Sequence, residues 1–323
     1  MAQADAPVLV VLRALGLGDF LTIVPALRAL AQYFPDHRRI LAAPLRLAPL
    51  VRLTDTVHAV VDARPLEPLP SSLHRPDVAV NLHGRGPQSH RILLALRPRR
   101  LVAFEHADVP ETSGFPRWRE DEHEVLRWCR LLSETGVPAN PLRLDLMPPA
   151  LTSERDEAAS IVHPGAGSVA RRWPISRWAS VARHEQEAGR RVLVTGNAEE
   201  RDECLALAGQ ASIDPSCVYA GLLDLDELAS LVARAGRVAC GDTGIAHLAT
   251  AVGTPSVVLF GPTSPALWGP LKDVDAHLVL WKGTLGDAHA GNPHDGLLAI
   301  SVEEVIGALG KLPLRSRAPS VVV

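Results

Sequence analysis

The stretch that decides the fold is GDTGIAHLA, residues 241–249. It follows an apolar run that predicts a buried strand (237–240), and it precedes a second such strand (256–260) that continues directly into Gly261, Pro262 and Thr263. We expect a helix to begin at Thr243 or Gly244. Its first backbone N–H groups and the positive end of its dipole would then converge on one spot, which suits a phosphate.

Asp242 stands beside this expected phosphate site, where a carboxylate would repel phosphate. It is better suited to holding hydroxyl groups. A site for an anion next to a site for hydroxyls is what a nucleotide-activated sugar requires. The alternative is that Asp242 or Thr243 only caps the N-terminus of the helix.

Length, charge and cysteine content set the class of protein. A chain of 323 residues predicts two domains of roughly 150 residues each. The net charge of −3 is small and the arginines are scattered between acids, which argues against nucleic-acid and polybasic membrane partners. The 4 cysteines have no Cys-x-x-Cys spacing and are expected to be reduced, structural thiols. No apolar run is long enough for a membrane span and no basic leader precedes the first strand, so we expect a cytoplasmic protein.

Short apolar runs alternate with amphipathic stretches along the whole chain, which predicts an α/β fold with parallel sheets. In the first half we expect strands at 8–14, 39–43, 59–63, 77–82 and 101–104, and helices at 20–33, 88–96 and 120–135. Residues 136–155 contain four prolines and predict a linker. In the second half we expect strands at 160–163, 191–195, 218–219, 237–240, 256–260 and 278–281, and helices at 175–188, 199–209, 226–235 and 302–309. The predicted architecture is two Rossmann-like, doubly wound domains facing across a cleft, with residues 1–150 and 151–312 as the domains and 313–323 as a tail.

Ligands bind at the carboxyl ends of the strands in such sheets, and the first such loop contains Gly16, Gly18 and Asp19. It begins like a dinucleotide fingerprint, but Leu21 occupies the third glycine position and the next strand ends without an acid, which disfavours nicotinamide and flavin enzymes. The glycines let a substrate approach the backbone. Asp19 could then act as a general base, or it could be an ordinary acid in the first turn of a helix.

Further loops supply candidate binding residues. The loop HPGAGS (163–168) contains Gly165 and Ser168 and is followed by Arg171, whose guanidinium suits phosphate oxygens. Trp173 is expected in the core. Glu199 and Glu200 could accept ribose hydroxyls or simply favour the start of a helix. In the first half, the residues expected to contact an acceptor, unless they are only solvated loop residues, are His83, Arg85 and Gln88, together with Gly16 and Gly18.

The glycine-Asp loop, the 163–174 stretch, Asp-Thr-Gly-x-x-His (242–247) and Gly-Pro-Thr (261–263) together resemble glycosyltransferase family 9. That family contains the ADP-heptose:lipopolysaccharide heptosyltransferases. The resemblance implies a GT-B fold with the acceptor on the first domain and the nucleotide sugar on the second. It also implies an inverting transfer that needs neither a metal nor a cofactor, with ADP-heptose as the donor substrate.

Carried over by position, Asp19 corresponds to the family's catalytic base. Asp242, Thr243, Gly244 and His247 correspond to donor contacts, with Thr263 in the adjoining motif. Arg171 stands where family members commonly have a lysine, and Glu199 or Glu200 lies near the ribose-binding acid. Residues 283–296, which include His289, His294 and Asp295, match no motif of the family, and a metal site there is an alternative.

The sequence leaves more than one acceptor and more than one activity possible. The acceptor is expected to be a glycan of the cell envelope, a lipid-linked glycan or a small molecule. A lipid-linked acceptor would bring the enzyme into transient contact with the inner membrane surface. A nucleotide-sugar epimerase of similar fold, or a non-catalytic nucleotide-sugar-binding homologue, are the alternatives to a transferase. The Asp-x-Asp sequence Asp224-Leu225-Asp226 is interpreted as a helix cap.

Overall fold

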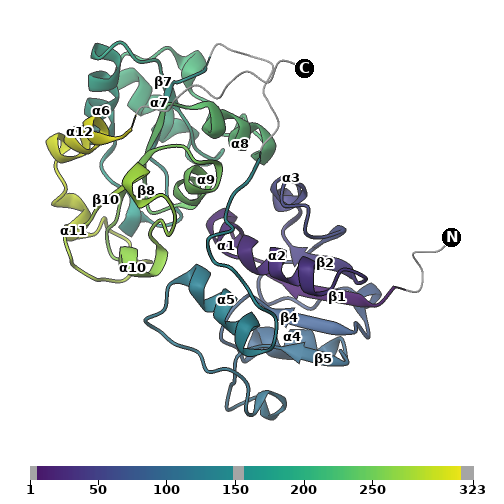
Figure 1. Ribbon diagram of the computed structural model, residues 1–323. Helices are drawn as coiled ribbons and strands as arrows, with labels where there is room; N and C mark the ends of the chain where they lie inside the picture. Colours follow the sequence, from purple (N-terminus) through teal and green to yellow (C-terminus); the bar gives the residue numbers. More distant parts are fainter. Residues whose placement is uncertain (1–5, 148–155, 314–323) are drawn as a thin grey trace, which may run out of the picture. The chain divides into compact units, whose positions relative to one another are not determined.

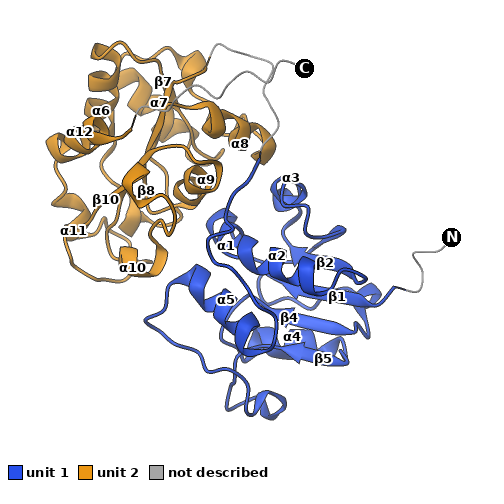
Figure 2. Cartoon of the chain, viewed as in Figure 1, with its two compact units in different colours: residues 1–147 blue, residues 148–323 orange. Residues whose placement is uncertain are grey.

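The computed structural model describes residues 6–147 and 156–313 and divides the chain into two compact units, residues 1–147 and 148–323 (Figures 1 and 2). The second part of the expected linker (148–155) and all of the expected tail beyond residue 313 lie outside the described residues.

The first unit is built on a parallel sheet with strand order β3-β2-β1-β4-β5. Its central strand pairs Val10 with Ile40 on one side and with Ala79 on the other. These three side chains belong to one buried apolar cluster. Strands of a parallel sheet are buried on both faces, which is why their sequences are continuous apolar runs. The strands are β1 (Val8–Leu12), β2 (Arg38–Ala43), β3 (Ala59–Asp62), β4 (Val78–Asn81) and β5 (Arg100–Val102).

The first helix of this unit differs from expectation, and a short helix at Ala48–Arg52 was not expected at all. Residues 20–33 were expected to form a single helix, but the chain forms α1 (Leu17–Thr22) and α2 (Val24–Tyr33), which meet at Ile23. The cause is Pro25 in the first turn of α2, because proline has no N–H to continue the hydrogen-bond ladder of α1. The other helices are α3 (Ala48–Arg52), α4 (Gln88–Ala95) and α5 (Glu124–Glu134).

The second unit repeats this layout with strand order β10-β9-β8-β6-β7, again all parallel. The expected strand at residues 218–219 is wrong. Only Val218 pairs, in an isolated bridge with Val194, because a turn of 3-10 helix at Pro215–Cys217 occupies the residues just before it. The strands are β6 (Ser160–His163), β7 (Val192–Val194), β8 (Arg237–Gly241), β9 (Ser256–Leu259) and β10 (His277–Leu280).

Helices cover both faces of this second sheet: α6 packs against α7 and α12, and α8 packs against α9 (Figure 1). Asp224 caps α8 through a hydrogen bond from the Glu227 N–H, which confirms the capping interpretation of Asp224. Trp173 is buried, as expected. The helices are α6 (Ile175–Glu187), α7 (Arg201–Gln210), α8 (Leu225–Arg234), α9 (Gly244–Val252), α10 (Pro265–Trp268), α11 (Asp295–Leu298) and α12 (Val302–Lys311).

None of the helices in the described part of the chain is both long enough and apolar enough to cross a membrane. All 4 cysteines are buried. Burial raises the pKa of the Cys129 and Cys204 thiols to about 12, so these thiols are unreactive at neutral pH.

Candidate functional site

Asp242 follows β8 at its carboxyl end and is the buried carboxylate of the second unit's candidate site. It is only 6% exposed. The Thr263 hydroxyl, in the loop after β9, hydrogen-bonds to this carboxylate, and Nη1 of Arg171 lies 3.9 Å from its Oδ2. Burial raises the pKa of Asp242 to about 6, although Arg171 and the Thr263 hydrogen bond both act to lower it. Burying a carboxylate removes it from water, which is energetically unfavourable. Such buried groups with shifted pKa values are concentrated at functional sites.

The start of α9 lies next to Asp242. Thr243 occupies the N-cap position in an extended conformation, and its side chain makes no capping hydrogen bond with any residue that the structure describes. The alternative that Asp242 or Thr243 simply caps this helix is therefore not supported. The Ala246 N–H donates to the Thr243 carbonyl oxygen over 3.0 Å. The N–H groups of Gly244 and Ile245 have no partner among the residues that the structure describes, so they remain available to an anion.

The loop after β6 brings Ser168 and Arg171 to the same edge of the sheet. Arg171 ends a turn of 3-10 helix (Val169–Arg171), and its Nη1 donates to the Asp242 carbonyl oxygen over 3.3 Å. Its Nε lies 3.4 Å from Ser168 Oγ. A guanidinium held by a neighbouring carbonyl and hydroxyl is oriented in advance for a planar, anionic ligand.

Glu200 lies next to Gly165, and the two neighbouring glutamates, Glu199 and Glu200, differ in their exposure to solvent. Glu199 is exposed, whereas Glu200 is 4% exposed and accepts a hydrogen bond from the Asn197 N–H over 2.8 Å. A Cβ atom on Gly165 would lie 2.2 Å from the Glu200 carboxyl carbon. A side chain at position 165 would therefore displace this carboxylate.

His247, on the first turns of α9, lies against Trp268 of α10 with the ring centroids 6.0 Å apart. Residues 283–296, which matched no motif, lie against the same loops. The Gly286 N–H donates to the Pro262 carbonyl oxygen (3.1 Å) and the His294 N–H to that of Ala170 (3.1 Å). The Ser168 hydroxyl donates to the Ala288 carbonyl oxygen over 2.5 Å. Residues 283–296 are therefore hydrogen-bonded to the loops that contain Ser168 and Pro262. The spacing of residues in the sequence did not predict these contacts.

Asp19 is the candidate base in the first unit, on the first turn of α1. Its Oδ2 accepts a hydrogen bond from the Gly16 N–H (3.2 Å), which is the contact expected of an ordinary acid in the first turn of a helix. Its Oδ1 lies 3.1 Å from Nη2 of Arg13, and its side chain is 32% exposed. The carboxylate is thus held in place while part of its surface stays accessible to a substrate.

Sequence reasoning missed Arg13, which directly follows β1. Its guanidinium is 1% exposed and contacts Asp19, Thr22 and Glu124. The available signal was a charged residue at the end of an otherwise apolar run, because a buried charge has to be paired.

The expected acceptor residues are only partly brought together. His83 lies beside the Gly16 loop, because its Nδ1 accepts from the Ala14 N–H over 3.2 Å. Burial and the nearby Arg13 lower the pKa of His83 to about 4, so it is neutral at physiological pH. Arg85 is exposed and pairs with Glu120 (3.0 Å). The structure does not bring the other two expected residues, Gly18 within α1 and the exposed Gln88 at the start of α4, into hydrogen-bond contact with Asp19 or His83.

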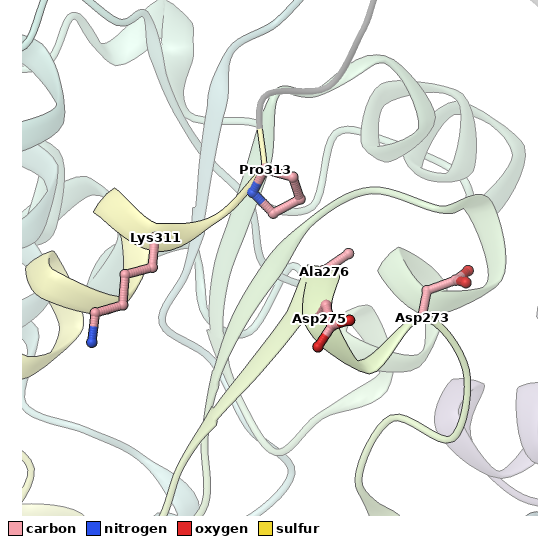
Figure 3. Close-up of a pocket in the computed structure, with 5 residues that line it drawn as sticks. All are labelled: Asp273, Asp275, Ala276, Lys311 and Pro313. Atoms are coloured by element: carbon pink, nitrogen blue, oxygen red, sulfur yellow. The ribbon is translucent and has the colours of Figure 1, made fainter.

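A surface pocket of the second unit lies elsewhere (Figure 3). Its lining residues are Asp273, Asp275, Ala276, Lys311 and Pro313. Asp275 and Ala276 directly precede β10, so this pocket belongs to the amino ends of the strands, whereas Asp242 and Thr263 follow carboxyl ends. It is therefore not the candidate donor site. In the described ranges, no group of three or more His, Cys, Asp or Glu side chains could hold a metal ion.

Residues 115–296, more than half of the chain, match the model of glycosyltransferase family 9 (heptosyltransferase). The chain belongs to this family. This confirms the family resemblance, and three of the four motifs lie within the matched residues.

Curated relatives of this family 9 chain include lipooligosaccharide heptosyltransferase 2 of Haemophilus influenzae, which is 33% identical over 220 residues. Lipopolysaccharide heptosyltransferase 2 of Escherichia coli K12 is 31% identical over 238 residues. These matches cover 65% and 68% of this chain, and 60% and 63% of the relatives. The chain thus matches less than two thirds of the length of either relative.

Solved structures share the fold of the family 9 chain. The E. coli ADP-heptose LPS heptosyltransferase II has a TM-score of 0.75 at 22% identity, covering 94% of this chain and 97% of that one. E. coli heptosyltransferase WaaC with ADP has a TM-score of 0.72 at 18% identity, covering 94% and 99%. These likenesses confirm the GT-B fold class, with two parallel-sheet α/β units.

Proposed function

We propose that this protein is an inverting, metal-independent glycosyltransferase that moves a heptose from ADP-heptose to an acceptor hydroxyl of a cell-envelope glycan. Membership of family 9 and relatives named as heptosyltransferases support the chemistry. The observation that carries the proposal is the buried Asp242 beside Arg171 and the uncapped start of α9. This combination suits a ligand with both hydroxyls and a diphosphate.

In this proposal, residues 151–312 bind the donor. Asp242, with Thr263, accepts hydrogen bonds from sugar hydroxyls, and Gly165 leaves room for Glu200 to accept those of the ribose. Negative charge grows on the diphosphate as it leaves. Arg171 and the N–H groups of Thr243 and Gly244 stabilise that charge, assisted by His247.

Residues 1–150 bind the acceptor, with Asp19 as the base. As the acceptor oxygen bonds to the anomeric carbon, its proton passes to the Asp19 carboxylate. The bond from the anomeric carbon to the diphosphate breaks, and its electron pair leaves with the phosphate oxygen. Attack opposite the leaving group inverts the anomeric configuration. Gly16, Gly18 and His83 border this carboxylate in sequence or in space and would contact the acceptor.

The direct test is incubation of the full chain with ADP-heptose and heptose-deficient lipopolysaccharide in EDTA, with products analysed by mass spectrometry and NMR. We expect ADP release, transfer of one heptose, and an anomeric configuration opposite to that of the donor. Conversion of the nucleotide sugar without an acceptor would instead indicate an epimerase. Binding without turnover on any acceptor would indicate a non-catalytic homologue.

The ribose assignment makes a separate prediction. Glu200→Gln should weaken ADP binding by on the order of 10- to 100-fold, because a buried charged acceptor of hydroxyl hydrogen bonds is lost. Glu199→Gln is the matched control, because this neighbouring side chain is exposed, and it should leave the Kd unchanged. Calorimetric titration with ADP compares the two. A larger loss in Glu199→Gln would transfer the role to Glu199.

A further inference from the structure

A buried ion cluster lies directly behind Asp19 in the first unit. Nη2 of Arg13 lies 3.1 Å from Asp19 Oδ1 and 2.9 Å from Glu124 Oε1. Arg13 and Glu124 are 111 positions apart in the chain. Two carboxylates, one partly exposed and one buried, therefore share a single guanidinium.

The remaining donors of Arg13 fix its orientation. Its Nε donates to the Asp19 carbonyl oxygen (3.0 Å), and its Nη1 donates to that of Leu82 (2.7 Å). Nη2 also lies 3.2 Å from Thr22 Oγ1. A guanidinium bound at each nitrogen has one orientation, so it holds both the backbone and the carboxylate of Asp19.

Glu124 is itself fully engaged, in the first turn of α5. Its Oε1 accepts from Trp128 Nε1 (2.9 Å) as well as from Arg13, and its Oε2 accepts from Arg127. Burial raises the pKa of Glu124, but the charges of Arg13 and Arg127 with the hydrogen bonds from Arg13 and Trp128 outweigh it, so the pKa is lowered. The cluster therefore pairs two arginines with two carboxylates.

We propose that Glu124 is a positioning residue for the reaction: through Arg13 it orients the Asp19 carboxylate and takes up part of the guanidinium's charge, which keeps Asp19 basic. The inference rests on the proposed role of Asp19. Without Glu124, the whole charge of Arg13 would act on Asp19 and make it a weaker base. Arg13 and Glu124 do not take part in the proton transfer itself, because the proton of the acceptor hydroxyl passes to Asp19.

The charged groups of the cluster around Asp19 come from two segments of this unit. Arg13 comes from the end of β1, and Glu124 and Arg127 come from α5. His83, in the loop after β4, is a further titratable neighbour, but its pKa of about 4 keeps it neutral above pH 5. The pH dependence of the step should therefore follow the carboxylates and their arginines.

Glu124→Gln tests the proposal through the pH profile of the transfer from ADP-heptose to heptose-deficient lipopolysaccharide. Removing a negative charge near Asp19 favours its ionised form, so the acid limb of kcat should move to lower pH by on the order of one unit. The plateau should fall about 3- to 10-fold, because the base is weaker. The affinity for ADP should not change.

Glu122→Gln is the matched control. Glu122 lies two positions away, and both of its carboxylate oxygens pair with Arg130 (2.7 Å) instead of Arg13. Its loss should lower the Tm without moving the acid limb. A shift in this control equal to that of Glu124→Gln would assign the effect to general loosening of α5 and would overturn the proposal.

Arg127→Gln should shift the acid limb in the opposite direction, and it can replace Glu124→Gln if that variant does not fold. Without the positive charge of Arg127, the negative charge of Glu124 acts more strongly on Arg13 and Asp19, so the acid limb of kcat should move to higher pH. In the Asp19→Asn background, Glu124→Gln should add no further loss of rate. If Asp19→Asn retains the rate, the assignment of the base fails. If Asp19→Asn is inactive but neither variant moves the limb, only the role of Glu124 is wrong.

Discussion

Asp19→Asn should lower the turnover of heptose transfer by on the order of 100- to 10,000-fold and leave donor binding largely intact. Asparagine keeps the shape of the side chain and can still accept the hydrogen bond from the Gly16 N–H, so α1 should form normally. It cannot take the proton of the attacking hydroxyl. The loss should therefore appear in kcat, while the Kd for ADP-heptose from calorimetry stays near that of the unmodified protein.

A control for this substitution is Asp36→Asn, an exposed aspartate of the same unit. It should retain full activity and a normal Tm. A rate near that of the unmodified protein in Asp19→Asn would remove Asp19 from the mechanism. The remaining candidate role for its carboxylate would then be the capping hydrogen bond that the structure already shows.

Asp242→Asn should have two opposite effects: it should weaken ADP-heptose binding and stabilise the protein. Buried ionised groups are unfavourable without full pairing, and burial raises the pKa of Asp242 from 3.8 to about 6. The unfolded chain loses this proton near pH 4 and the folded chain near pH 6, so stability falls as the pH rises through that window. At roughly 1.4 kcal/mol per pH unit, ionisation costs the folded state on the order of 3 kcal/mol.

The measurement is denaturant unfolding of Asp242→Asn and of the unmodified protein at several pH values. At pH 8 the variant should be more stable by on the order of 1–3 kcal/mol, and the difference should vanish below about pH 4, where both states of Asp242 are protonated. Asp275→Asn, at an exposed position of the same unit, should show no such gain. Equal or lower stability of Asp242→Asn at pH 8 would contradict the conclusion that the ionised Asp242 carboxylate destabilises the folded state.

The same substitution also separates the sugar from the nucleotide. Because Asp242 is proposed to hold sugar hydroxyls, its loss should weaken ADP-heptose more than ADP. The affinity of the unmodified protein for ADP-heptose should fall as the pH drops through about 6, as the carboxylate takes up a proton. Asp242→Asn should lose this pH dependence.

The sequence predicted the parallel-sheet fold because apolar strands and amphipathic helices have different periods, and because Gly-rich loops follow strand ends. It placed Asp242 and Thr243 correctly between β8 and α9. It could not distinguish Glu199 from Glu200, because spacing does not show which side chain turns inward at a helix start. The sequence signal for the break between α1 and α2 is Pro25, because proline cannot donate the backbone hydrogen bond that would continue α1.

Contacts between distant parts of the chain were beyond sequence reasoning. Nothing in the sequence links Arg13 to Glu124, since this pairing depends on how α5 packs in the folded unit, where it contacts α2. The support of the donor loop by residues 283–296 rests largely on backbone hydrogen bonds, which any sequence can make. In both cases the local pattern predicts an element, and only packing decides what it contacts.

The most direct test of the central claim is a calorimetric titration of the full chain, in EDTA, with ADP-heptose and with GDP-, UDP- and dTDP-sugars, repeated on Asp242→Ala. We predict that ADP-heptose binds tightly, that the other nucleotide sugars bind weakly or not at all, and that Asp242→Ala loses the preference for ADP-heptose over ADP. Absence of binding to every nucleotide sugar, or equal binding by Asp242→Ala, would contradict the proposed donor site.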